Sequence, residues 1–217
     1  MAGGGASAWD SVGGTNQLPR SLYLADAKDR AAAAAAFNPT TGKFDLELDG
    51  SIRGVMSRQV ITSFMFADVV SYSKLGELEV LVFIKHFLGA VQRLIDAMPR
   101  RKKPRLQNTW GDAITCIWPR PKEAGEFALM LSDMVTRTPW ERLGLPSSLS
   151  IRISLHAAPV HSVVDPVLGK RNYSGVHTSR GARIEPITPP GSVYCTQAFA
   201  AISETMDVGT FTCDPVG

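Results

Sequence analysis

From Val60 onward, apolar stretches that predict strands alternate with segments whose apolar residues recur at helical spacing. Residues 60–72 are rich in Val, Ile and Phe and predict a central strand with both faces covered. Between Lys74 and Met98, apolar residues recur every three or four positions, which predicts a helix. These residues are Val80, Ile84, Phe87, Leu88, Val91, Leu94 and Ile95.

The later segments continue the alternation. Residues 105–118 predict two short strands around a Gly-Asp turn, and residues 121–137 predict a helix. Residues 148–164 predict a strand pair, followed by a helix over 176–186 and a strand over 192–196. The order β-α-β-β-α-β predicts a ferredoxin-like α+β fold, in which helices pack on an antiparallel sheet.

The residues before position 60 differ in composition from the rest. Residues 1–20 are rich in Gly and Ser and predict a flexible tail. Residues 21–59 are expected to form an N-terminal extension with a helix over 22–36 and a short strand over 44–48. We therefore expect one main domain over 60–205 and a C-terminal strand or tail over 206–217.

Composition restricts the classes of partner and compartment. The formal net charge of +3 gives no overall field that favours nucleic acid or a membrane as partner. Cys116, Cys195 and Cys213 have neither close pairing nor metal-type spacing, which favours a reducing compartment. No stretch approaches the roughly 20 apolar residues of a membrane span, and the N-terminus lacks signal-peptide regions. We expect a soluble, cytoplasmic protein.

Two acids stand at positions that call for an explanation. Asp68 lies inside the apolar strand, where an uncompensated carboxylate costs several kcal/mol, and Asp112 lies at the predicted hairpin turn. In the predicted fold the hairpin packs beside the first strand, so the two carboxylates converge. Mg²⁺ or Mn²⁺ between them would offset their repulsion. The alternative is that Asp68 caps a helix and Asp112 only forms a turn.

Four separated segments resemble, in order and spacing, the catalytic domain of class III nucleotidyl cyclases. They are FADVVSYSKL (66–75), NTWGDAI (108–114), IRISLHAAPV (151–160) and YSGVHTSRGARIEPITPPGSVYCT (173–196). The resemblance covers about residues 60–205. It implies the class III cyclase type of the predicted fold and the conversion of a nucleoside triphosphate into a 3′,5′-cyclic nucleotide and pyrophosphate.

The resemblance also implies the roles of individual residues. Asp68 and Asp112 would hold two divalent cations, Mn²⁺ or Mg²⁺, with a further ligand from the backbone carbonyl of Val69. Arg183 matches the family's transition-state arginine. Ser179, four residues earlier on the same helix, replaces the ribose-positioning asparagine.

Other matched positions would contact the substrate. Arg152 matches an arginine that contacts the phosphates, and the segment after Asp68 would wrap the triphosphate. This segment includes Val70, Ser71, Tyr72 and Ser73.

The sequence departs from the pattern of purine cyclases at the base-recognising positions. Asn108 stands where those enzymes carry a lysine, and Asn172 stands where they carry Asp or Thr. No Lys or Arg follows Arg183, although the family usually has a phosphate-binding lysine there. Both metal acids and the arginine remain, which indicates changed specificity rather than lost activity. Phe66 and Tyr72 are expected to narrow the base pocket.

These departures, in a short stand-alone domain, resemble the bacterial pyrimidine cyclases of the Pycsar antiphage systems. That resemblance implies a cyclic UMP or cyclic CMP product, which activates a separate effector protein. The amides of Asn108 and Asn172 suit uracil and can also rotate to pair with cytosine; we favour UTP slightly. The alternatives are a cytidylate or purine cyclase, or a catalytically silent domain that binds nucleotide or a partner.

The resemblance also predicts the assembly. In the family, the metal acids of one chain face the arginine and a base-recognising residue of another, and this chain has a single copy of each. We therefore expect a homodimer with shared active sites.

Overall fold

The computed structural model describes residues 37–38, 43–44 and 58–216, and the chain divides into two units, Met1–Gly54 and Val55–Gly217. In the first unit, β1 (Phe37–Asn38) pairs antiparallel with β2 (Lys43–Phe44). The predicted tail over 1–20 and helix over 22–36 lie outside the described residues. The same is true of the predicted strand over 44–48, except for Phe44.

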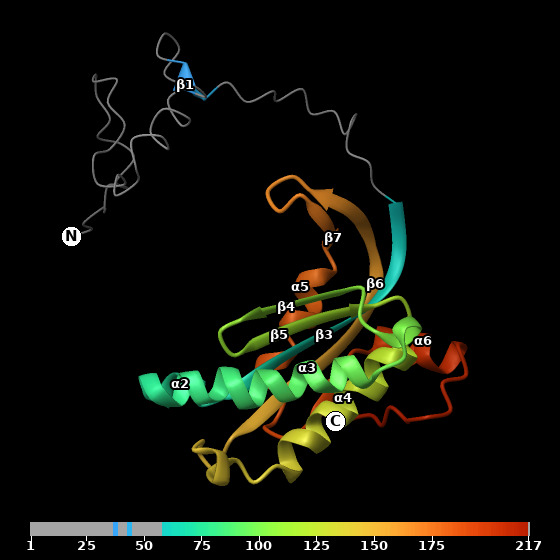
Figure 1. The fold of residues 1–217 in the computed structure, drawn as a ribbon. Helices are drawn as coiled ribbons and strands as arrows, with labels where there is room; N and C mark the ends of the chain where they lie inside the picture. The colour runs from blue at the N-terminus through green and yellow to red at the C-terminus, as the bar shows by residue number, and fades with distance from the viewer. Residues whose placement is uncertain (1–36, 39–42, 45–57, 217) are drawn as a thin grey trace, which may run out of the picture. The chain divides into compact units, whose positions relative to one another are not determined.

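The second unit is built on a six-stranded sheet with the order β4-β5-β3-β6-β7, in which β8 pairs with β6 (Figure 1). The pairs along this order are antiparallel, and β8 runs parallel to β6. The predicted first strand is the central strand β3, and the predicted hairpin is β4 and β5. The strands are β3 (Arg58–Val70), β4 (Leu106–Trp110), β5 (Ala113–Trp118), β6 (Ser150–Asp165), β7 (Lys170–Ser174) and β8 (Val193–Cys195).

One face of the sheet is covered by helices. The helix predicted over 74–98 consists of α2 (Glu77–Phe83), a π-helical turn (Ile84–Leu88) and α3 (Gly89–Ala97), and α4 (Pro121–Arg137) has the predicted bounds. The sequence did not predict α6 (Gln197–Thr205), which buries Phe199 in the same core. Short 3₁₀ turns connect these elements: Tyr72–Lys74, Arg100–Lys102, Trp140–Leu143 and Glu185–Ile187.

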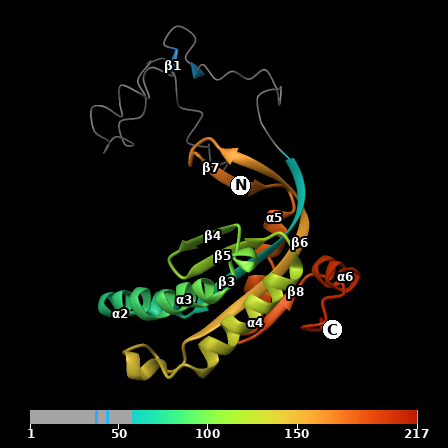
Figure 2. The same cartoon turned by 45° about the vertical axis from the view of Figure 1, so that its right-hand side comes forward.

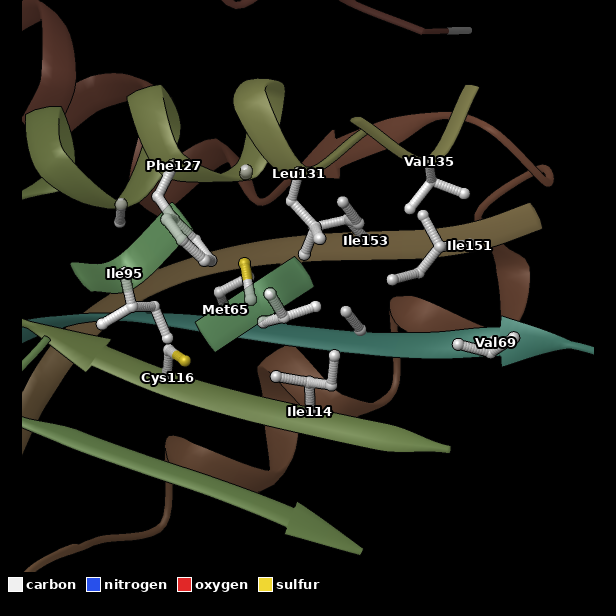
Figure 3. Packing of buried hydrophobic residues seen from close by; sticks show 14 of the residues in the cluster. Met65, Val69, Ile95, Ile114, Cys116, Phe127, Leu131, Val135, Ile151 and Ile153 are labelled. Atoms are coloured by element: carbon white, nitrogen blue, oxygen red, sulfur yellow. The ribbon is translucent and has the colours of Figure 1, made fainter. Parts of the chain in front are cut away.

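The core lies between this sheet face and the helices. Figure 3 shows Phe127 and Leu131 pointing from α4 toward Met65 on β3 and Ile153 on β6, and all four side chains are almost fully buried. Because strand side chains alternate between faces, Met65, Ala67 and Val69 face the helices while Phe64, Phe66 and Asp68 face the other way. The α+β fold with helices on an antiparallel sheet is confirmed.

The prediction of a strand pair over 148–164 is wrong, because the segment forms the single strand β6. Pro159 does not interrupt it, since β8 pairs with residues 153–155 and β7 with residues 161–165, which leaves no neighbouring strand beside Pro159 at that edge. The long strands β3 and β6 extend past β4 and β5 and carry β7 at their far end (Figures 1 and 2).

The C-terminal part differs from the expectation in two places. The helix predicted over 176–186 is shorter and consists of α5 (Thr178–Ala182) followed by the 3₁₀ turn from Glu185. Residues 206–216 form no strand, and the ring of Phe211 stacks near that of Phe199 at 6.2 Å between centroids. Within the described residues, no helix has the length and apolarity that crossing a membrane requires.

The second sheet face carries α5. A Cβ atom at Gly181 would lie 2.6 Å from Cε2 of Phe66 and 2.9 Å from Cβ of His156, so only glycine allows this approach. The Ser154 hydroxyl donates a hydrogen bond to the Gly181 carbonyl at 3.0 Å. These contacts hold α5 against β3 and β6.

Replacing Gly181 by alanine is expected to lower the free energy of unfolding by about 1–3 kcal/mol, because the added methyl group must displace a ring and a neighbouring side chain. Urea denaturation measures this change. Gly209→Ala is the matched control, since a Cβ atom there would meet nothing within 4 Å. Equal stability of the two variants would contradict the docking of α5 on the sheet.

Candidate active site

Asp68 and Arg152 form an ion pair across two adjacent strands. Asp68 on β3 lies directly opposite Arg152 on β6, so their side chains project from the same sheet face. Nη2 of Arg152 donates to Oδ2 of Asp68 at 2.9 Å, and both side chains are about one-quarter exposed, at 27% and 26%. The guanidinium therefore compensates the charge of Asp68, a pairing that the sequence did not predict.

Asp112 lies near this pair, at the β4–β5 turn. The preceding Gly111 has a φ of 60°, a left-handed conformation that the tight turn requires. Burial raises the pKa of the Asp112 carboxyl, and the charge of Asp68 raises it further, whereas its own backbone N–H and the charge of Arg152 lower this pKa. The structure thus places the two carboxylates within electrostatic range of each other.

Glu185 is a third acid at this place, and the sequence interpretation missed it. Its Oε1 lies 3.0 Å from Nε of Arg152, and its side chain is 15% exposed. Burial raises the pKa of the Glu185 carboxyl; Arg152 lowers this pKa, while the charges of Asp68 and Asp112 raise it. One sequence signal was present: Glu185 is the sole acid between Asp165 and Glu204.

Asp68 and Asp112 fit a divalent cation. Two carboxylates are the donor set from which Mg²⁺ or Mn²⁺ is commonly held, with water and phosphate oxygens completing the shell. A cation would also relieve the repulsion that raises the pKa of Asp112. The Val69 side chain is buried in the core, so its backbone carbonyl alone is available as a further ligand. Among the described residues, no group of three or more His, Cys, Asp or Glu side chains forms a metal site.

The segment predicted to wrap the triphosphate turns sharply after β3. Val70 ends the strand, Ser71 has a left-handed φ of 65°, and a 3₁₀ turn begins at Tyr72. Ser71 and Ser73 are exposed, so their hydroxyls are accessible to a ligand.

The structure does not bring Phe66 and Tyr72 into one pocket. The Phe66 ring stacks with that of Phe64 on the second sheet face, with centroids 6.1 Å apart. The Tyr72 ring packs edge-on against Phe83 at 5.0 Å and belongs to the core under the helices. The turn at Ser71 directs the chain away from the face that carries Phe66.

The two predicted base-recognising amides are also apart within one chain. Asn108 is exposed on the edge strand β4, whereas Asn172 lies on the opposite edge strand, β7. The Asn172 amide donates to Oδ2 of Asp165 at 3.1 Å and accepts a hydrogen bond from the backbone N–H of Tyr173 at 2.8 Å. Its polar atoms are therefore engaged inside the β6–β7 hairpin.

Ser179 and Arg183 lie at the surface of the second sheet face. Ser179 is in α5 and Arg183 is the residue that ends this helix, and both are exposed. Among the ion pairs of the described residues, none involves Arg183. These two residues therefore remain accessible to a second molecule.

Comparison with solved structures identifies the fold. One similar structure is the catalytic core of a rhodopsin-guanylyl cyclase with converted specificity in complex with ATPalphaS (18% identity, 74% of this chain and 89% of that chain, TM-score 0.59). Another is the adenylyl cyclase CyaB from P. aeruginosa (11%, 69% and 83%, TM-score 0.59). A third is the guanylate cyclase domain of RhGC from Catenaria anguillulae in complex with GTP (19%, 68% and 84%, TM-score 0.55).

The chain therefore has the fold of adenylyl and guanylyl cyclase catalytic domains, and this fold covers most of the second unit. No protein-family model matches the sequence, and a search of curated proteins finds no similar sequence.

Proposed function

We propose that this protein is a nucleotidyl cyclase of the class III type, which converts a nucleoside triphosphate into a 3′,5′-cyclic nucleotide and pyrophosphate. The observation that carries the proposal is the convergence of Asp68, Asp112 and Arg152 on one sheet face of a cyclase fold. Two acids and a cation beside an exposed turn are the groups that phosphoryl transfer requires.

In this mechanism Asp68, Asp112 and the Val69 carbonyl hold two Mn²⁺ or Mg²⁺ ions. When bound, these ions favour ionisation of the ribose 3′-hydroxyl and neutralise charge on the triphosphate. Arg152 and the hydroxyls of Ser71 and Ser73 bind phosphate oxygens. The guanidinium of Arg183 balances the charge that develops on the α-phosphate, and Ser179 orients the ribose.

A homodimer completes the site in this proposal. Arg183 and Ser179 are exposed at the end of α5, and no printed contact joins them to the acids of their own chain. In a head-to-tail dimer each site would combine the acids of one chain with the arginine and serine of the other. The exposed Asn108 then serves the base of a substrate held by the second copy.

We further propose UTP as the preferred substrate and cyclic UMP as the product, acting on a separate effector in antiphage defence. Support comes from the amide at Asn108, which can donate to and accept from a pyrimidine edge. Because Asn172 is hydrogen-bonded inside its hairpin, Asn108 bears most of this argument. The solved relatives described above hold ATPalphaS and GTP, so a purine substrate is the principal competitor.

A competition assay tests the substrate. The protein is incubated with Mn²⁺ and equal concentrations of the four ribonucleoside triphosphates, and the cyclic products are separated by mass spectrometry. We expect one dominant product, cyclic UMP, because a site built on hydrogen bonds to the base discriminates by orders of magnitude.

Each other outcome has a separate meaning. Cyclic CMP would contradict only the choice between pyrimidines, and cyclic AMP or cyclic GMP would contradict the argument from Asn108. Absence of any cyclic product would favour a domain that binds nucleotide without turnover.

A further inference from the structure

Arg152 is shared between two acids, and this sharing leads to an inference that rests on the proposed function. We propose that Glu185 is a positioning residue for Arg152: it retains the guanidinium when a divalent cation takes over Asp68, and so keeps Arg152 beside the triphosphate. In the metal-free protein Arg152 then acts as the counterion of the metal site.

The contacts of Arg152 divide the guanidinium between two directions. Nη2 donates to Asp68 at 2.9 Å, Nε lies 3.0 Å from Oε1 of Glu185, and Nη1 donates to the carbonyl of Pro186 at 3.4 Å. The 3₁₀ turn from Glu185 to Ile187 therefore holds one side of the guanidinium, while Asp68 holds the other. Loss of the Asp68 contact would leave Arg152 attached to this turn.

The contact with Glu185 is an ion pair that has not closed into a hydrogen bond. Nε of Arg152 and Oε1 of Glu185 are both buried, and within the described residues neither has a hydrogen-bond partner. Buried polar groups are usually hydrogen-bonded, so an unsatisfied pair at this distance indicates a geometry that a small rotation would complete. Release of Nη2 from Asp68 allows that rotation.

Charge explains why the release accompanies metal binding. A divalent cation beside Asp68 and Asp112 repels the guanidinium and competes with it for Asp68. Three carboxylates face one guanidinium here, so the site keeps an excess of negative charge that attracts a cation. Removing Glu185 would lower this excess and would also leave Arg152 bound to Asp68 alone. Both effects oppose metal binding.

The experiment measures Mn²⁺ binding by the purified full chain without nucleotide, from the electron paramagnetic resonance signal of free Mn²⁺. We expect Glu185→Gln to weaken binding about tenfold, at the lower end of effects seen for groups that orient metal ligands. Arg152→Gln should instead tighten binding roughly three- to tenfold, because the competing cation is gone. Asp96→Asn, which removes an exposed acid paired with Lys103, is the charge-matched control and should leave binding unchanged.

The double variant separates a positioning role from direct ligation. If Glu185 acts through Arg152, Glu185→Gln should weaken Mn²⁺ binding much less in the Arg152→Gln background than in the wild type. Equal losses in both backgrounds would identify Glu185 as a metal ligand and overturn the proposal. Thermal unfolding of each variant checks that it is folded; if Glu185→Gln is unfolded, the sign of the Arg152→Gln effect decides by itself.

Kinetics give a second readout. Glu185→Gln should raise the KM for the triphosphate at saturating Mn²⁺, and it should not raise KM further when Arg152 is already glutamine. A wild-type protein that binds Mn²⁺ but makes no cyclic nucleotide would refute the proposed function and leave the binding experiment valid. A wild type that binds no Mn²⁺, or a Glu185→Gln protein that binds like the Asp96→Asn control, would overturn the inference.

Discussion

Replacing Asp112 by alanine is expected to abolish cyclic-nucleotide formation, by at least about 10³-fold, without unfolding the protein. A carboxylate that holds the catalytic ions contributes several kcal/mol of transition-state stabilisation, and each 1.36 kcal/mol corresponds to about tenfold in rate. The measurement is product formation with Mn²⁺ and the preferred triphosphate.

The stability of the same variant distinguishes a catalytic acid from a structural one. Burial and the charge of Asp68 raise the pKa of Asp112 in the folded protein, so its carboxylate opposes folding once the pH exceeds the unfolded-state pKa. Below that pKa the cost is absent. At pH 7 without metal, the alanine variant should therefore unfold at the same or a higher temperature than the wild type.

Asp133→Ala is the control for this pair of measurements, because Asp133 is exposed on α4 and pairs with Arg137. It should retain wild-type activity. Full activity of Asp112→Ala would exclude the proposed two-metal site, and a large loss of stability would assign Asp112 a structural role.

Mixing two inactive variants, Asp68→Ala and Arg183→Ala, is expected to restore activity. In a mixed dimer the acids of one chain and the arginine of the other remain intact, so one of its two sites can work. With random exchange about half of the dimers are mixed, which corresponds to about one quarter of wild-type activity. Activity is measured after the subunits have exchanged, with exchange followed by differently tagged chains.

The matched control mixes Asp68→Ala with Asp112→Ala. Both lesions fall in the acidic half of the site, so no mixed dimer contains an intact site and no activity should return. Failure of the first mixture despite demonstrated exchange would show that Arg183 acts within its own chain or not at all.

The sequence by itself determined the elements whose pattern is local. Apolar spacing predicted the helices at 74–98 and 121–137, because a buried helix face repeats every 3.6 residues over several turns. The Gly-Asp turn predicted the β4–β5 hairpin, and the apolar run before Asp68 predicted the central strand. The single strand β6 was missed because Pro159 interrupts a strand pattern unless its edge has no neighbour.

Only the tertiary structure decided which side chains meet at the candidate site. Arg152 and Asp68 are 84 positions apart in the chain, and the pairing of β3 with β6 sets them opposite each other. A shift of one residue in that register would move Arg152 to the other sheet face. Glu185 joins them through the packing of α5, which Gly181 permits. Such contacts depend on register and close packing between distant segments, and no local pattern of residues encodes either.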